Sequence, residues 1–306
     1  MQRRALLLGL GALSACGPKP RPAPPPAPAL RAASELIPAD LDVVVRLDWG
    51  RMKGVLGSLA LTALSRQVLA HGGAGAAADE LVLGSLLAAD QVYLGYRPSP
   101  LLLPLDRVLA LQGRFEPIAQ TPAGFSGAVD LGGDLRYWER RPGAQLERGE
   151  VARIYALGDR VRGFASVAEL DAIERLLAGQ GGERRLAPPE EGTLSLAARP
   201  WLLSRLSGRG SLRDMLDQAR TLVMVVDLES DGGRFELELT LESAERAQSL
   251  AGAGQAVLQR LGGRLGPRAT LRADGDRVVL SARLSRGELA LALACWQGAS
   301  DPNCAW

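Results

Sequence analysis

The chain has 306 residues, and its 36 Lys and Arg against 34 Asp and Glu give a formal net charge of +2. Five of the basic residues and no acidic ones lie in the first 33 residues, so the rest carries 31 basic against 34 acidic side chains. Because aromatic residues make up only 4% of the chain, this body lacks both the basic surface and the stacking side chains typical of nucleic-acid binding. We therefore exclude nucleic acid as a partner.

The first residues have the layout of a secretory signal peptide. Arg3 and Arg4 precede an apolar run over residues 5–12, and the sequence LSAC follows at residues 13–16. The run is shorter than the roughly 20 apolar residues that span a bilayer. We expect residues 1–15 to be a signal peptide and not a transmembrane helix.

The LSAC sequence resembles the lipobox of bacterial lipoproteins, in which an aliphatic and two small residues precede an invariant cysteine. The resemblance implies that Cys16 is acylated and becomes the mature N-terminus, and that its acyl chains anchor the protein firmly in a membrane. Gly17 replaces the aspartate that retains enteric lipoproteins at the inner membrane. This favours the outer membrane, facing the periplasm. A chance cysteine behind an ordinary signal peptide is the alternative, and the Arg3-Arg4 pair leaves Sec and twin-arginine export both open.

Residues 16–33 form the predicted lipidated cysteine and linker. Seven prolines lie between Gly17 and Ala29, and such a run favours extended polyproline II at about 3.1 Å per residue. We predict a semi-rigid stalk with a reach of roughly 50 Å. A proline-rich ligand for a partner domain is the alternative interpretation.

Two cysteines remain at the C-terminal end of the chain. Cys295 and Cys304 lie close together in sequence, and the compartment outside the inner membrane is oxidising, so we predict a disulfide between them. Zinc usually takes four Cys or His ligands. Because the single histidine, His71, is far away in sequence, we expect no metal site.

The first half of the body alternates strand and helix patterns. A strand over residues 42–49 leads into a helix with apolar residues at helical spacing, and strands over 91–97 and 106–115 follow. Residues 116–134 are too rich in Pro and Gly for a regular helix, and form either a degenerate helix or a functional loop. Residues 152–179 then predict strand, turn, strand and helix.

The second half shows the same succession. A strand over 192–201 precedes a hairpin over 221–242, which turns at Ser230-Asp231-Gly232-Gly233. A helix over 243–261 precedes strand, turn, strand and helix over 269–298. Both closing units contain the sequence GDRV, and each helix opens with a capping box, Ser166 with Glu169 and Ser285 with Glu288.

These parallels predict an α+β fold of two tandem repeats, each a mainly antiparallel sheet with helices packed on one face. The repeats would span residues 34–180 and 192–306, with a linker over 181–191. The body also loosely resembles a broad group of uncharacterised exported bacterial proteins, and this resemblance supplies no functional residues.

No catalytic motif is complete. Ser126 stands in Gly-Phe-Ser-Gly, which breaks the spacing of a nucleophile elbow. The glycine-rich stretch over 73–78 follows a helix instead of a strand, so it lacks the context of a dinucleotide site. Asp159 and Asp276 recur in the two GDRV turns, where aspartate beside glycine is ordinary turn chemistry.

We therefore expect a membrane-anchored envelope lipoprotein with a non-catalytic binding or scaffolding role, no catalytic residues and no cofactor. Its partners would be the membrane, through the N-terminal lipid, and another envelope protein. Two alternatives stay open: an envelope hydrolase that uses Ser or Asp/Glu without histidine, or a carrier of an apolar ligand. An apolar cavity would favour the carrier, and clustered acids with strongly shifted pKa values would favour the hydrolase.

Overall fold

The computed structural model describes residues 32–56, 76–98, 104–146, 149–182, 186–201, 219–261, 268–285 and 287–288. Cys16, His71, Cys295 and Cys304 lie outside this described part, together with the signal peptide and most of the stalk. The acylation and disulfide predictions at those residues therefore stay predictions.

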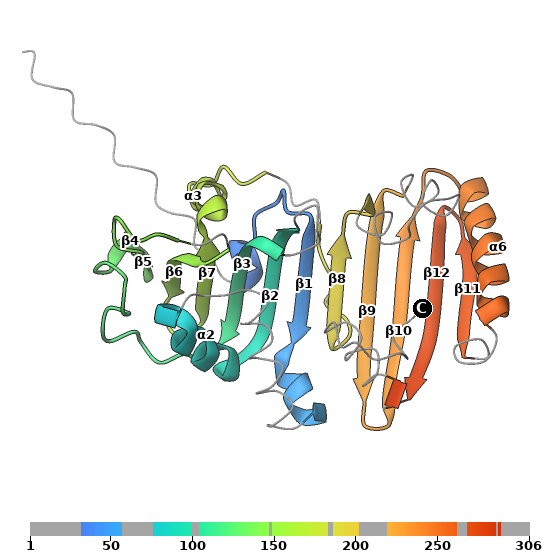
Figure 1. The fold of residues 1–306 in the computed structure, drawn as a ribbon, viewed down its shortest axis with the longest axis horizontal. Coiled ribbons are helices and arrows are strands. Elements are labelled where there is room, and N and C mark those ends of the chain that lie inside the picture. Colours follow the sequence, from blue (N-terminus) through green and yellow to red (C-terminus); the bar gives the residue numbers. More distant parts are fainter. Residues whose placement is uncertain are drawn as a thin grey trace, which may run out of the picture.

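The described residues form a mixed helix and sheet structure built on one twelve-stranded antiparallel sheet (Figure 1). Its order is β11-β12-β10-β9-β8-β1-β2-β3-β7-β6-β5-β4. The strands are β1 (Val43–Asp48), β2 (Ala89–Pro98), β3 (Pro104–Gly113), β4 (Val129–Gly132), β5 (Leu135–Glu139), β6 (Val151–Leu157), β7 (Val161–Ser166), β8 (Leu194–Ala198), β9 (Thr221–Glu229), β10 (Gly232–Thr240), β11 (Ala269–Asp274) and β12 (Arg277–Ser285).

The two halves of the chain share this sheet instead of forming the two separate sheets that the sequence suggested. The first strand of each half, β1 and β8, pair antiparallel in the middle, with Val45 opposite Leu196. Asp42 also forms an ion pair with Arg199, with 3.2 Å between Oδ1 and Nε. Pairing the two strands removes two open sheet edges, which otherwise present unpaired backbone groups.

Strand order is the same on both sides of the β1–β8 pair. From β1 outward it is β1-β2-β3-β7-β6, and from β8 outward it is β8-β9-β10-β12-β11. Corresponding backbone bonds close each side, because the N–H of Phe115 donates to the carbonyl of Asp159 and the N–H of Leu241 to that of Asp276. The first half then adds β5 and β4 at its outer edge.

Tight turns connect the strand pairs where the sequence predicted them. The two GDRV sequences turn between β6 and β7 and between β11 and β12. Gly158 and Gly275 have φ of 53° and 61° there, a left-handed conformation that glycine adopts at little cost. Ser230 and Asp231 alone separate β9 from β10, which makes a two-residue hairpin loop.

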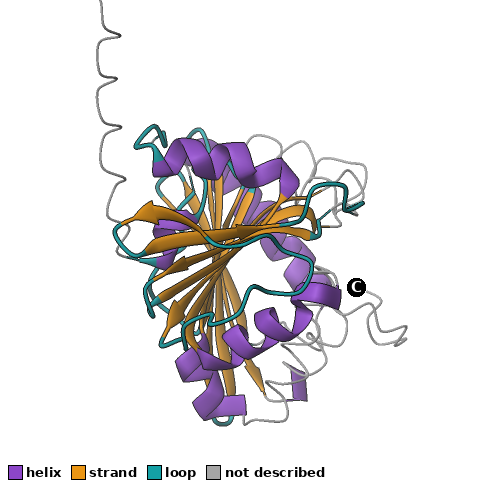
Figure 2. Cartoon of the chain, turned by 90° about the vertical axis from the view of Figure 1, so that its left-hand side faces the viewer, coloured by secondary structure: helices purple, strands orange, loops and turns teal. Residues whose placement is uncertain are grey.

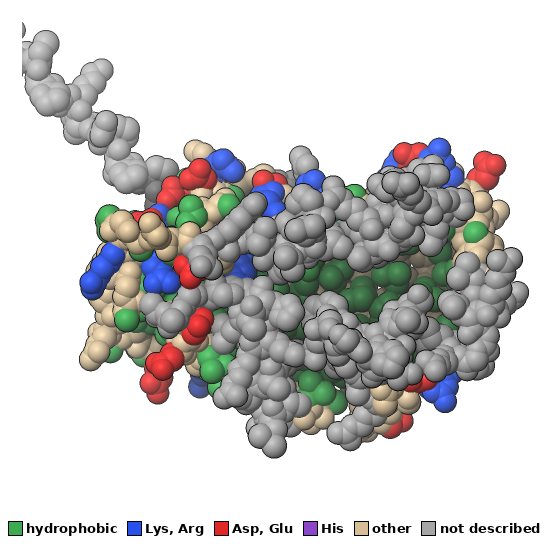
Figure 3. Space-filling view, in the orientation of Figure 1, with side chains coloured by type: hydrophobic (Ala, Val, Ile, Leu, Met, Phe, Trp, Pro, Cys, Tyr) green, Lys and Arg blue, Asp and Glu red, His purple; other side chains and the backbone are tan. Residues whose placement is uncertain are grey.

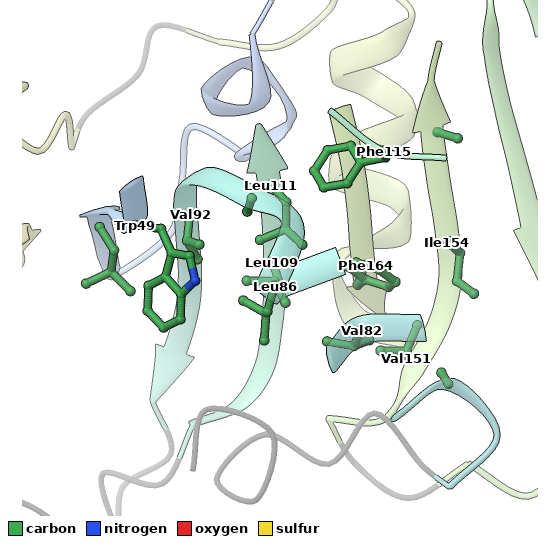
Figure 4. Packing of buried hydrophobic residues seen from close by; sticks show 14 of the residues in the cluster. Trp49, Val82, Leu86, Val92, Leu109, Leu111, Phe115, Val151, Ile154 and Phe164 are labelled. Atoms are coloured by element: carbon green, nitrogen blue, oxygen red, sulfur yellow. The ribbon is translucent and has the colours of Figure 1, made fainter. Parts of the chain in front are cut away.

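Helices cover both faces of the first half, which corrects the prediction of helices on one face. Figure 2 shows helices on both sides of the twisted sheet. The helix α2 (Ala76–Ala88) packs Val82 and Leu86 on one face, in the cluster shown in Figure 4. The helix α3 (Leu170–Leu177) packs Ile173 on the other face. Every residue of β7 is buried, so both faces of the sheet are covered at this strand.

Four further helical segments lie in the described structure. A 3-10 helix, η1 (Ala33–Leu36), lies on the α3 face, and residues 49–56 are helical after β1. The helix α6 (Ala244–Leu261) follows β10, as the sequence predicted, and packs on β11 and β12. A short 3-10 turn, η2 (Val167–Glu169), precedes α3. No helix in the described ranges is long and apolar enough to cross a bilayer.

The segment over residues 116–134 has no helix, as its composition predicted. It carries β4 and a bridge between Phe125 and Arg140. The ring of Phe125 is fully buried in the α2-face core, and the Arg140 guanidinium lies over it, 4.7 Å from the ring centre. The segment thus closes one end of the core.

The two predicted capping boxes have different outcomes. At Ser285 the box is present: the Ser285 N–H and hydroxyl both donate to the Glu288 carboxylate, and the Glu288 N–H donates to the Ser285 hydroxyl. At Ser166 it is absent. The Ser166 hydroxyl accepts the Arg107 N–H instead, and Glu169 pairs with Arg97.

Candidate apolar binding site

Side chains from eight neighbouring strands form a row across one face of the sheet. In a strand alternate side chains point to the same face, and the antiparallel registers place one aliphatic residue of each strand directly opposite the next. We call this set the middle row. Its members from β3 to β11 are Leu109, Leu94, Val45, Leu196, Met224, Leu237, Leu280 and Leu271.

The rows on either side of the middle row are also apolar. One contains Leu194, Val226 and Phe235, and the other contains Ala198 and Leu222. We call the three rows together the apolar face. Within these three rows, from β3 to β11, the only polar side-chain groups are the Arg107 guanidinium and the Tyr96 hydroxyl.

The opposite face of the second half is charged instead. Arg277 forms ion pairs there with Glu238 and Asp274, and the Ser281 hydroxyl donates to Glu236. This contrast explains the alternating pattern of β10 and of most of β12 in the sequence, whereas β9 also carries Val223 and Val225 on the charged side.

The apolar face is only partly covered. From Leu94 to Leu271 every member of the middle row is half-buried, whereas Leu222 and Leu239 in a flanking row are buried at 4% and 7% exposure. Figure 3 shows hydrophobic side chains in the centre of this face, over the strands on the β8 side. The middle row thus forms an apolar floor that runs across the strands.

The helix α6 closes the far end of this floor. Ala247 and Leu250 of α6 pack on Leu239 and Val278 in the same core cluster. Gly254 lies against Leu271 so closely that a Cβ atom at this position would overlap the leucine side chain. The glycine therefore permits α6 to approach β11.

Arg107 and Tyr96 lie at the near end of the face, side by side on β3 and β2. Arg107 is 9% exposed, and burial lowers the pKa of its guanidinium to about 10, with Asp79 the charge that opposes this effect. The group remains charged at neutral pH. Burial also raises the pKa of Tyr96, so its hydroxyl stays protonated.

A buried ion-pair network lies on the α3 face. Glu169 is fully buried, and its two oxygens accept from Arg97 Nε and Nη2 at 2.9 and 3.4 Å. Arg97 also pairs with Asp40, with 2.8 Å between Nη2 and Oδ1. Burial raises the pKa of Glu169, and the hydrogen bonds and charge of Arg97 oppose this. Because Arg97 occupies both carboxylates, we assign this network to structure.

A second network links α3 to the outer strands. Arg153 of β6 pairs with Glu174 of α3 at 2.7 Å and with Glu139 of β5 at 2.8 Å. Its guanidinium also lies over the Tyr137 ring, 4.5 Å from the centre. The distribution of these buried arginines is not visible in the sequence, because each depends on strands that pair far apart along the chain.

Residues considered for catalysis from the sequence are not brought together. Asp159 and Asp276 lie in turns on β7 and β12, which are seven strand positions apart in the sheet. At about 4.8 Å per strand this is roughly 34 Å, whereas paired catalytic carboxylates lie about 5 to 10 Å apart. The Ser126 hydroxyl donates to the Glu139 carbonyl at 3.1 Å. Among the described residues, no group of Asp, Glu, Cys and His side chains could hold a metal ion.

The fold is similar to that of the Treponema protein TP0453, which has been solved in several crystal forms. Forms I, III and IV match with TM-scores of 0.52, 0.51 and 0.52 at 13% sequence identity. The matches cover 87 to 88% of this chain and 97 to 98% of TP0453. No protein-family model and no curated protein sequence matches the chain.

Proposed function

We propose that the chain is a lipid-anchored protein of the bacterial cell envelope whose body binds an apolar ligand on the apolar face, without catalysis. The observation that carries the binding role is the half-buried middle row, in which aliphatic side chains follow one another across the strands from Leu94 to Leu271. Monomeric proteins rarely leave a continuous apolar patch accessible unless it binds something.

The envelope location rests on the N-terminal sequence and on the shared fold. The LSAC sequence would place an acylated Cys16 in the outer membrane, facing the periplasm, with the proline-rich stalk between membrane and body. TP0453 is itself an envelope lipoprotein-like protein. A protein held at a membrane surface lies next to a source of apolar molecules, which agrees with the proposed ligand class.

The strand order supports one further part of the proposal, that the body consists of two copies of one unit. The two halves have the same outward order from the β1–β8 pair and corresponding GDRV turns. Superposition of β1, β2, β3, β7 and β6 on β8, β9, β10, β12 and β11 tests this. A duplication requires the same pleat, with Val45 and Leu196 facing the same way.

Binding is tested with a neutral fluorescent probe, N-phenyl-1-naphthylamine, and competing straight-chain alcohols. The protein is the secreted chain with Cys16→Ser, which is not acylated. Each buried methylene contributes about 0.8 kcal/mol, so two more carbons should strengthen competition roughly tenfold until the chain outgrows the floor.

Met224→Gln places a polar group on the floor and should weaken probe binding several-fold, because the amide loses water when the ligand binds. Val223→Gln is the matched control, since the adjacent residue points to the opposite face. An equal effect of both substitutions, or no dependence on chain length, would refute binding at this face.

A further inference from the structure

The apolar face carries one charge, at the corner where the floor begins. Alternation along β3 places Arg107 on the same face as Leu109, two residues away, and the β2–β3 register places it beside Tyr96. Arg107 is nine-tenths buried. Its backbone N–H donates to Ser166, but the part of the chain that the structure describes offers its guanidinium no hydrogen bond or ion pair.

Two other buried arginines of the sheet have strong partners, whereas the Arg46 guanidinium has only the Gly192 carbonyl, at 3.4 Å. Arg162 donates to the Glu116 carbonyl at 2.5 Å, and Arg153 pairs with two carboxylates. For Arg107 the described residues supply only the charge of Asp79 on α2, without an ion pair between them. A charged group on an otherwise apolar face, without a carboxylate bound to it among the described residues, is suited to an anionic ligand that approaches along that face.

We propose that Arg107 binds the anionic head group of the ligand, so that the ligand is a long-chain carboxylate of the fatty-acid class with its hydrocarbon chain on the middle row. The Tyr96 hydroxyl lies beside it as a neutral donor. This inference rests on the proposed function, since it requires a chain on the apolar face.

The dimensions agree with such a ligand. The floor runs from β3, beside Arg107, to β9 over four strand spacings, or about 19 Å. A membrane acyl chain spans about 15 Å, half of a hydrocarbon core of about 30 Å. A carboxylate at Arg107 would thus place the end of a chain of about 15 Å near Leu196 of β8, three strand spacings away, where the floor is half-buried.

The test compares oleate with oleyl alcohol, which have the same chain and differ in the head group. Affinities are measured by probe displacement at pH 8 on the Cys16→Ser chain and on Arg107→Met, Arg107→Lys and Arg234→Met variants. Arg234 lies exposed on the opposite face and controls for a general loss of positive charge.

The unaltered chain should prefer oleate over the alcohol by about tenfold to a hundredfold, the range expected for a hydrogen bond between charged groups. Arg107→Met should bring this ratio to about one. Arg107→Lys should keep part of the preference, and Arg234→Met should keep all of it. The melting temperature of Arg107→Met should not fall, because the guanidinium has no hydrogen bond or ion pair to lose among the described residues; a purely structural arginine would show the reverse.

Two failures are distinguishable. If oleate and oleyl alcohol bind equally well, or if Arg107→Met leaves their ratio unchanged, the assignment of Arg107 is wrong and the apolar site stands. If neither compound displaces the probe, the proposed function fails and the assignment fails with it.

Discussion

Glu169 and Arg97 depend on each other because the carboxylate has no water. Glu169 is fully buried, and Arg97 bridges it to the half-exposed Asp40 at the entry to β1. Removing one partner of a buried pair costs more than the pair contributes, since the remaining charge is left without solvation. The same reasoning predicts that the stability lost on breaking this pair depends on pH.

We expect Arg97→Met to lower the free energy of unfolding by about 3 kcal/mol at pH 7. The loss should shrink as the pH is lowered toward 5. Burial raises the pKa of Glu169, and without Arg97 nothing within the pair opposes that rise. The folded variant then takes up a proton that the unfolded chain, near the ordinary value of 4.5, does not, so acid stabilises its folded state relative to neutral pH. Urea unfolding at both pH values measures this.

Arg199→Met is the matched control for that substitution. Arg199 pairs with Asp42, two residues from Asp40, but its side chain is 37% exposed. An exposed pair contributes at most about 1 kcal/mol, and its loss should change little between the two pH values. Equal losses in the two variants would contradict a special role for the buried carboxylate.

The two capping-box motifs show which contacts of single residues can be predicted from the sequence and which cannot. The motif at Ser285 and Glu288 forms the expected capping box, since both residues are exposed and only local contacts compete. The same motif at Ser166 fails because β3 and β2 bring Arg107 and Arg97 to it. A local pattern could not show these long-range partners, nor that Arg107 is buried.

At the scale of elements, α6 and β11 meet through a glycine. Gly254 lies against Leu271 with no room for a Cβ atom, whereas nothing lies near Gly252 on the same helix. Alanine is favoured over glycine in a helix interior by about 1 kcal/mol. The two glycines therefore separate helix propensity from packing.

We expect Gly252→Ala to stabilise the protein by about 0.5 to 1 kcal/mol. Gly254→Ala gains the same propensity but must displace Leu271, and overpacking costs about 1 to 3 kcal/mol. Gly254→Ala should therefore be less stable than Gly252→Ala by at least about 1 kcal/mol in chemical denaturation. If the two variants are equally stable, α6 does not press on β11 as described.

Most strands and hairpins were predictable, because alternation and turn residues are local. The β9–β10 and GDRV hairpins follow from such patterns. The pairing of β1 with β8 joins segments about 150 residues apart, and no local pattern contains it. The apolar floor depends on that pairing, which is why the sequence suggested a carrier only as an alternative.

At the scale of the whole molecule, the two halves are held together by more than the β1–β8 pair. Arg51, in the helix after β1, pairs with Asp227 of β9 at 3.0 Å, and the Asp48 N–H donates to the Thr193 carbonyl at 2.9 Å. We therefore treat the described body as one unit. If Cys16 is acylated as proposed, the length of the predicted proline-rich stalk decides how far this unit can act from the membrane.

Deletion of residues 18–28 tests the role of that reach. An extended polyproline segment buries almost no surface, so the shortened chain should unfold at the same temperature as the full body in a calorimetric scan. Its acylation at Cys16 should also be unaffected, and mass spectrometry of the N-terminal peptide would verify this. Cys16→Ala provides the opposite control, because it should release the body from the membrane fraction.

Recovery of an envelope partner by crosslinking in intact cells should nevertheless fall sharply on deletion. Eleven residues of polyproline II extend about 34 Å at 3.1 Å per residue, and a body held that much closer to its anchor cannot meet a partner placed farther out. If the shortened chain still captures the same partner as efficiently, the stalk is a spacer without a set length, and the body delivers or receives its ligand at the anchoring membrane itself.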